Sequence, residues 1–270
     1  MAYDRNIVIE LARGEENYLE KRDGNLAYLY NKMANAGSKN YTKYGKEMHD
    51  LYPAVMDYPA PWCDCFVDWC FMQAYGVSNA RKIICGDFDD YTVASAQLYK
   101  DKNAWKPAGT VPEPGWQIFF KNSVRICHTG LVIGYDPERR VVITSEGNTS
   151  SAPGVVANGG CVRQKEYSVD DPAIAGYGVP AYGDGNFAFT PHWVRSGEKW
   201  YYRIAEGVNA HGWKLINHHW YYFDDSGIML TGWQQIDGQW FYLEESGDYE
   251  GACWHECEKR NGSQERWYVE

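Results

Sequence analysis

The fold of this chain is decided by residues 61–76, which read PWCDCFVDWCFMQAYG. Pro61 favours a helix start, because its fixed φ suits the first helical position and its missing N–H would be unpaired there anyway. Apolar residues then recur at helical spacing until Gly76, which we expect to end the helix. Cys63 falls in the first turn, where free backbone N–H groups and the helix dipole favour a thiolate. The stretch therefore predicts a nucleophile at a helix start, with N–H groups that could stabilise an oxyanion.

The remaining cysteines do not suggest a metal or disulfide framework. Cys65 and Cys70 lie deeper in the predicted helix, and we expect them to be buried thiols. The chain has 8 cysteines, and their spacing fits neither paired zinc motifs nor a compact disulfide scaffold. Cys253 and Cys257 are the one pair that could join in an oxidising medium.

A β-hairpin is predicted downstream of this helix. Residues 126–135 and 141–144 are apolar runs that flank a short polar loop. If residues 137–139 form the loop, Gly130 lies opposite Glu146, and the apolar side chains gather on the other face. A register shifted by one residue would turn the Glu146 carboxylate toward that apolar face, where its charge could not be paired.

This register supplies a base for the thiol. His128 lies opposite Asn148, on the same face as Glu146, so either polar residue could orient its imidazole. His128 would then act as general base toward Cys63 and as general acid toward a leaving amine. Elsewhere before residue 183, only His49 is a competing histidine.

The end of the chain contains a repeat of 20 residues. Each unit has a Trp, a second Trp seven positions later, an aromatic pair and a turn that contains Gly, which indicates stacked β-hairpins. A last, irregular copy runs from Trp254 to Trp267, as expected where a stack ends. We expect one domain over 1–183, a turn-rich linker over 184–191 and the repeats over 192–270.

Composition narrows the class of protein. The net charge is −10 at pH 7, which argues against nucleic-acid binding because phosphate recognition needs clustered Lys and Arg. The chain has no apolar run of the roughly 20 residues that a membrane span requires. Its N-terminus does not resemble a secretory signal, so we expect synthesis in the cytoplasm.

The first 35 or so residues look helical and the later ones strand-rich, which predicts an α+β domain before the repeats.

Three ordered motifs resemble the CHAP family of cysteine, histidine-dependent amidohydrolases and peptidases. They are residues 61–70, 127–132 and 145–150, and the similarity extends from about residue 5 to 182. The resemblance implies a papain-like α+β fold that hydrolyses amide bonds in the peptide part of peptidoglycan. It places Cys63, His128 and Glu146 on the catalytic positions, with Asn148 beside them.

The chain departs from the family pattern at two places. Relatives often have Ala where Asp64 stands, and Gly-Asp where Gly115-Trp116 stands; both changes could alter substrate contacts. Some relatives bind calcium through an Asp-rich loop, but residues 87–90 are interpreted here as a solvated turn, and no metal or cofactor is expected.

The repeats resemble those of choline-binding and glucan-binding proteins, in which aromatic side chains form cages for a quaternary ammonium or platforms for sugars. The candidate ligand-binding residues are Trp193, Trp200, Trp213, Trp220, Tyr222, Trp233, Trp240 and Tyr242.

The combination is similar to phage or prophage endolysins, which act on the bacterial wall after release from the cytoplasm. The expected partners are peptidoglycan and, through the repeats, teichoic-acid choline or a wall polysaccharide. The expected activity is that of an N-acetylmuramoyl-L-alanine amidase or a stem or bridge endopeptidase. The alternatives are a wall-binding protein without catalysis and a bacterial effector that targets peptidoglycan.

Overall fold

A computed structural model describes residues 3–183, 191–196, 199–205, 208–216, 219–247, 250–256 and 266–268. Contacts divide the chain into two compact units, Met1–Ala188 and Phe189–Glu270, and each is treated separately below. The expected linker over 184–191 lies almost wholly outside the described residues, and so does Cys257. Within the described ranges, no helix is long and apolar enough to cross a bilayer.

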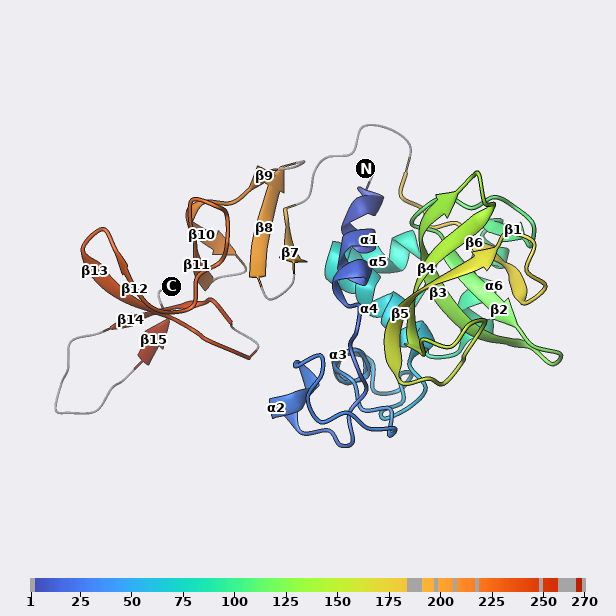
Figure 1. Ribbon diagram of the computed structural model, residues 1–270, viewed down its shortest axis with the longest axis horizontal. Helices are drawn as coiled ribbons and strands as arrows, with labels where there is room; N and C mark the ends of the chain where they lie inside the picture. The colour runs from blue at the N-terminus through green and yellow to red at the C-terminus, as the bar shows by residue number, and fades with distance from the viewer. Residues whose placement is uncertain are drawn as a thin grey trace. The chain divides into compact units, whose positions relative to one another are not determined.

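The first unit places helices before a sheet, which confirms the predicted α+β class (Figure 1). Its helices are α1 (Arg5–Gly14), α2 (Leu26–Leu29), α3 (Lys43–Leu51), α4 (Cys63–Tyr75), α5 (Val77–Ile83) and α6 (Thr92–Asp101). Its strands are β1 (Trp105–Pro107), β2 (Gln117–Lys121), β3 (Ile126–Asp136), β4 (Val141–Thr149), β5 (Cys161–Ser168) and β6 (Ile174–Gly178). The strands form an antiparallel sheet in the order β1-β6-β2-β3-β4-β5.

The expectation of helix over the first 35 residues is wrong for most of that stretch beyond Gly14, where only the short α2 is helical. After α1 the backbone runs along the start of β5: the Asn17 N–H donates to Val162 O at 3.1 Å, and the Glu20 N–H donates to Gly160 O at 2.8 Å. Pairing with a distant strand thus replaces the helical hydrogen bonds that the local pattern favours.

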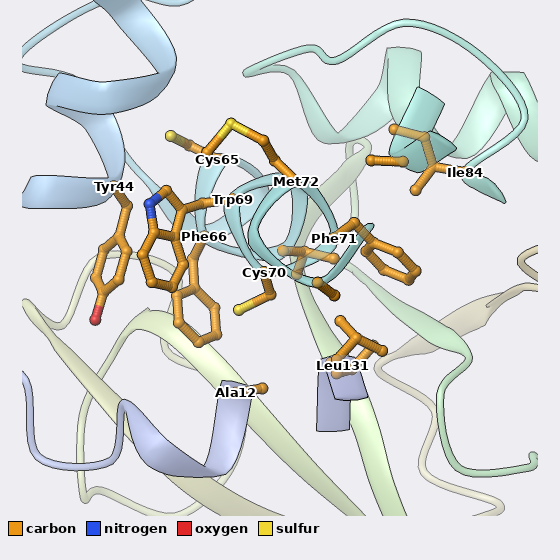
Figure 2. Packing of buried hydrophobic residues seen from close by; sticks show 14 of the residues in the cluster. Ala12, Tyr44, Cys65, Phe66, Trp69, Cys70, Phe71, Met72, Ile84 and Leu131 are labelled. Atoms are coloured by element: carbon orange, nitrogen blue, oxygen red, sulfur yellow. The ribbon is translucent and has the colours of Figure 1, made fainter. Parts of the chain in front are cut away.

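Helix α4 forms the centre of the main apolar cluster. It contacts α1, α3, α5, β3 and β4, and its side chains point outward on several sides among residues such as Tyr44, Ala12 and Leu131 (Figure 2). A helix that is apolar all round is stable only when covered on all sides. Gly76 ends it with φ 72°, a conformation that suits glycine, as predicted. Packing on several sides therefore holds the helix that begins at Cys63.

The β3–β4 hairpin has the predicted register at its inner end but not at its loop. Leu131 pairs with Ser145, as expected, but the register shifts between Val132 and Gly134, so that Asp136 pairs with Val141. The loop consequently has one residue more than predicted, because the bulge takes up a residue of β3.

Both faces of this hairpin are buried, which corrects the expectation of one apolar face. Leu131 and Ile133 pack in the cluster around α4. Val132 and Val142 pack in a second cluster, with Phe120 on the other face of the sheet. The polar site residues therefore lie within a covered sheet.

The second unit consists of the predicted hairpins. Its strands are β7 (His192–Ser196), β8 (Lys199–Ala205), β9 (Val208–Asn209), β10 (Gly212–Ile216), β11 (His219–Phe223), β12 (Gly232–Ile236), β13 (Gln239–Leu243), β14 (Cys253–Glu256) and β15 (Arg266–Tyr268). The same cross-strand pair recurs in three hairpins: Trp193 with Tyr202, Trp213 with Tyr222, and Trp233 with Tyr242. The 20-residue sequence period is thus a structural period.

The described cysteines are all free thiols: Cys63, Cys65, Cys70, Cys85, Cys127, Cys161 and Cys253.

Candidate active site

Cys63 lies in the first turn of α4, as predicted, but the helix begins at Cys63 itself and not at Pro61, which precedes the N-cap residue Trp62. Trp62 is the residue before the helix, and no side chain caps it. The first turn of a helix has N–H groups without intrahelical partners, so those near the Cys63 thiol are available to a ligand. Trp62 is buried and its indole N–H donates to Glu20 Oε2 at 3.1 Å, which anchors this end of α4.

His128 lies on β3 between the thiol and a carboxylate. Its side chain is fully buried, and Nε2 lies 2.9 Å from Glu146 Oε2. Within the described chain, Nδ1 has no hydrogen-bonding partner of its own, while the Cys63 thiol interacts with the imidazole. His128 therefore connects the residue at the helix start with the residue on the neighbouring strand.

The electrostatics of the site favour a protonated imidazole. Burial by itself lowers the pKa of His128, but the interactions with Cys63 and Glu146 outweigh it and raise the pKa from 6.5 to about 10. An imidazolium next to the thiol favours the thiolate form of a cysteine, which is the nucleophilic one.

The Glu146 carboxylate is held from three sides. Besides His128, the Thr144 hydroxyl donates to Oε1 at 2.6 Å and the Tyr167 hydroxyl to Oε2 at 3.2 Å. Because every one of these groups is buried, the carboxylate has a single satisfied orientation. The Phe120 ring stacks on the imidazole, with centroids 5.8 Å apart.

Asn148 lies further along β4 and does not hydrogen-bond to His128. It is fully buried with φ 54°, its Oδ1 accepts the Gly160 N–H at 3.3 Å, and its Nδ2 has no partner within the described chain. Of the two candidates for orienting the imidazole, the structure places Glu146 in contact with it.

The competing residues are engaged elsewhere. His49 Nδ1 lies 2.6 Å from Met56 O, and its ring is tilted against Tyr58. Cys65 and Cys70 are buried in the core, and burial raises the pKa of both thiols. Neither His49 nor these two cysteines joins the site.

The acidic stretch over 87–90 is not the solvated turn we expected. Phe88 is buried in the main cluster, and the Asp89 N–H donates to Asp68 Oδ2 at 3.1 Å. In the part of the chain that the structure describes, no three His, Cys, Asp or Glu side chains gather as a metal site would require.

Sequence reasoning missed two partners of Glu146. Thr144 stands two residues before Glu146 on the same face of β4, so strand periodicity could have identified it. Tyr167 comes from β5, and no local pattern connects it with Glu146.

The aromatic repeats form clusters between successive hairpins. Trp193 lies 6.3 Å from Trp200 of its own hairpin and 4.8 Å from Tyr221 of the next, measured between ring centroids. The pattern recurs one repeat later, where Trp213 lies 6.4 Å from Trp220 and 4.9 Å from Phe241. Tyr221 and Phe241 were not among the predicted residues, although their position in the Trp-aromatic-Tyr triplet is aromatic in each repeat.

A cation of the chain itself lies over one of these rings. The Arg195 guanidinium lies 5.1 Å from the centre of the Trp200 ring, which shows the attraction of an indole face for positive charge. Trp233 and Trp240 of the third hairpin are 46% and 55% exposed, so their faces are open.

A thiol at a helix start, next to an imidazole held by a carboxylate, is an arrangement that can support nucleophilic catalysis by cysteine. Residues 54–148 match the CHAP domain family, and residues 210–249 match the choline-binding repeat family. The chain therefore contains a CHAP domain, typical of cysteine- and histidine-dependent amidohydrolases and peptidases, and a choline-binding repeat.

Several solved structures are similar to this chain. The choline binding domain of Spr1274 from Streptococcus pneumoniae is 30% identical, with 24% of this chain and 94% of that chain covered and a TM-score of 0.21. CbpJ from Streptococcus pneumoniae is 19% identical; the match covers 54% of this chain and 60% of CbpJ, with a TM-score of 0.22. The pneumococcal cell wall endolysin from phage Cp-1, complexed with choline, is 20% identical; the match covers 41% of this chain and 39% of the endolysin, with a TM-score of 0.14. No curated protein matches the sequence.

Proposed function

We propose that this protein hydrolyses an amide bond in the peptide part of bacterial peptidoglycan, with Cys63 as nucleophile. The bond is either the one between muramic acid and L-alanine or one within the stem or bridge peptide. The observation that carries the proposal is the fully buried His128, whose Nε2 lies 2.9 Å from Glu146 Oε2 and whose pKa is raised by the neighbouring Cys63 thiol and Glu146 carboxylate against the lowering effect of burial. The CHAP match over 54–148 supports the same reaction class.

The residues divide the reaction into two steps. The Cys63 thiolate attacks the amide carbonyl, and first-turn N–H groups of α4 stabilise the oxyanion. Protonated His128 gives its proton to the leaving amine, so the C–N bond breaks and a thioester remains. His128 then takes a proton from water, whose oxygen attacks the thioester; the C–S bond breaks, and a carboxylic acid and the Cys63 thiolate are released beside the protonated His128.

Glu146 and Asn148 support these steps in different ways. Glu146 holds the imidazole in one orientation and stabilises its protonated form, as the third member of a catalytic triad does. Asn148, with its buried Nδ2, is proposed to assist at the same site. The reaction uses no cofactor.

The repeats are proposed to bind the enzyme to the wall. A quaternary ammonium fits between two Trp faces of one hairpin and the aromatic ring of the next, as in the cluster of Trp193, Trp200 and Tyr221. The ligand would be teichoic-acid choline or a wall polysaccharide, and binding would raise the effective concentration of the catalytic unit at its substrate. This two-part arrangement is that of an endolysin.

The test compares wild type with Cys63→Ala on purified cell walls. We expect the wild type to clear the suspension and the variant to bind without clearing it. Equal lysis by both would contradict the proposal. Mass spectrometry of the digest assigns the bond: free muramic lactyl groups with new N-terminal alanine identify an amidase, and new amines within the stem or bridge identify an endopeptidase.

A further inference from the structure

A buried polar network lies behind the candidate active site. Asp64 follows Cys63 in the first turn of α4 and is fully buried. Ser95 of α6 donates its hydroxyl to Asp64 Oδ2 at 2.6 Å. Asp64 therefore does not make the direct substrate contact that its departure from the family pattern suggested. Within the described residues no Lys, Arg or His forms an ion pair with it, so hydrogen bonds alone offset its burial.

Gln117 of β2 connects Asp64 to the strand of the base. Its Nε2 donates to Asp64 Oδ1 at 3.1 Å and to Thr129 Oγ1 at 3.1 Å. Thr129 directly follows His128 on β3. The Gln117 amide thus joins Asp64, which follows Cys63, to Thr129, which follows His128.

The directions of these hydrogen bonds are determined. The Thr129 hydroxyl donates to Ile118 O at 2.7 Å, so Oγ1 can only accept from Gln117. The Tyr99 hydroxyl donates to Gln117 Oε1 at 3.0 Å, which orients the NH₂ group of Gln117 toward Asp64 and Thr129. Because the network is satisfied and buried, it resists movement of α4 relative to β3.

The charge on Asp64 responds to pH in the neutral range. Burial and the nearby Asp89 and Asp90 raise the pKa of Asp64 to about 7, although hydrogen bonds from Ser95 and Gln117 oppose the rise. The other titratable groups that face it are Asp68, Cys65 and Tyr99.

We propose that Asp64 and Gln117 are positioning residues that set the placement of the Cys63 thiol relative to the His128 imidazole. The expected effect on kcat rests on the proposed function as a peptidoglycan hydrolase. A misplacement of about 1 Å between reacting groups can cost roughly a hundredfold in rate, and the Gln117 bridge joins this turn of α4 to β3. A loss of the bridge should therefore reduce kcat and leave KM nearly unchanged.

The first experiment removes the bridge and measures two reactions. Gln117→Leu keeps the approximate volume but makes no hydrogen bonds. We expect kcat on solubilised peptidoglycan, and the rate of Cys63 alkylation by iodoacetamide, to fall by about tenfold or more. KM should change by less than about twofold. Circular dichroism and thermal unfolding show whether the variant is folded.

Matched variants separate positioning from stability. Asp68→Asn changes an equally buried aspartate of α4 outside the Gln117 bridge, and should leave kcat unchanged. Should Gln117→Leu fail to fold, Thr129→Val removes the same bridge at its other end, and Thr129→Ser should restore it. Asp64→Asn can keep the bridge without a charge, so it should lose less of the alkylation rate than Gln117→Leu does.

The outcomes are decisive. Wild-type kcat and alkylation rates in folded Gln117→Leu would overturn the inference. Alkylation needs no peptidoglycan, so it tests the positioning of Cys63 independently of hydrolysis. If wild-type protein fails to lyse walls, the proposed function is rejected, but the alkylation test of positioning still stands.

Discussion

The side chain of Glu146 lies directly against the backbone of Gly130. A Cβ atom at position 130 would lie 2.6 Å from Glu146 Cγ and 3.0 Å from Ser145 O. Glycine is therefore required on β3 for the carboxylate to reach His128. The contact agrees with the register that the sequence predicted for these two residues.

Gly130→Ala should displace Glu146 from His128. We expect a loss of about 1–3 kcal/mol in the free energy of unfolding from overpacking, and a fall in kcat of about tenfold. Urea unfolding and lysis assays measure the two effects. Gly134→Ala is the matched control, because its nearest new contact, Ile143 Cδ1 at 3.4 Å, is an ordinary one. Equal behaviour of the two variants would argue against the packing role of Gly130.

Glu146→Gln should keep the fold and lose much of the rate. The carboxylate accepts from His128, Thr144 and Tyr167, whereas an amide NH₂ cannot accept and would face at least one donor. We expect hydrolysis to fall about ten- to hundredfold. If the rate is unaffected, the orienting role passes to Asn148, which Asn148→Ala would then test.

The stability contributed by His128 should depend on pH. Its folded pKa, about 10, is above the unfolded value of 6.5, so the contribution is complete below about pH 6.5 and is lost as pH rises through 10. The difference in unfolding free energy between wild type and His128→Gln should therefore shrink between pH 6 and pH 10.5. A difference that stays constant over this range would contradict the assigned shift.

Tyr221→Ala should weaken binding to the wall more than Tyr201→Ala. The two positions are equivalent in the repeat, but Tyr221 packs on Trp193 of the preceding hairpin, whereas Tyr201 belongs to the first hairpin. We expect about tenfold weaker retention on a tertiary-amine resin for Tyr221→Ala, from the loss of one face of the cage. Elution of wild type by free choline checks the ligand, and failure to elute would favour a wall polysaccharide.

Part of the candidate site could be predicted because it is local. Gly76 ends α4 through backbone chemistry, Pro61 lies just before the N-cap residue of the helix, and strand alternation places Glu146 on the face of His128. The loop of the same hairpin was predicted wrongly, because a bulge next to Val132 does not disturb the apolar pattern on either side of it.

The sequence by itself determined a helix with Cys63 in its first turn, the inner register of the β3–β4 hairpin and the 20-residue aromatic period, since each follows from turn chemistry or side-chain periodicity. Only the tertiary structure decided that Tyr167 holds Glu146, that Gln117 joins Asp64 to Thr129, and that Tyr221 packs on Trp193. These contacts depend on which strands and hairpins become neighbours, and that order is set by burial of whole faces rather than by local propensity.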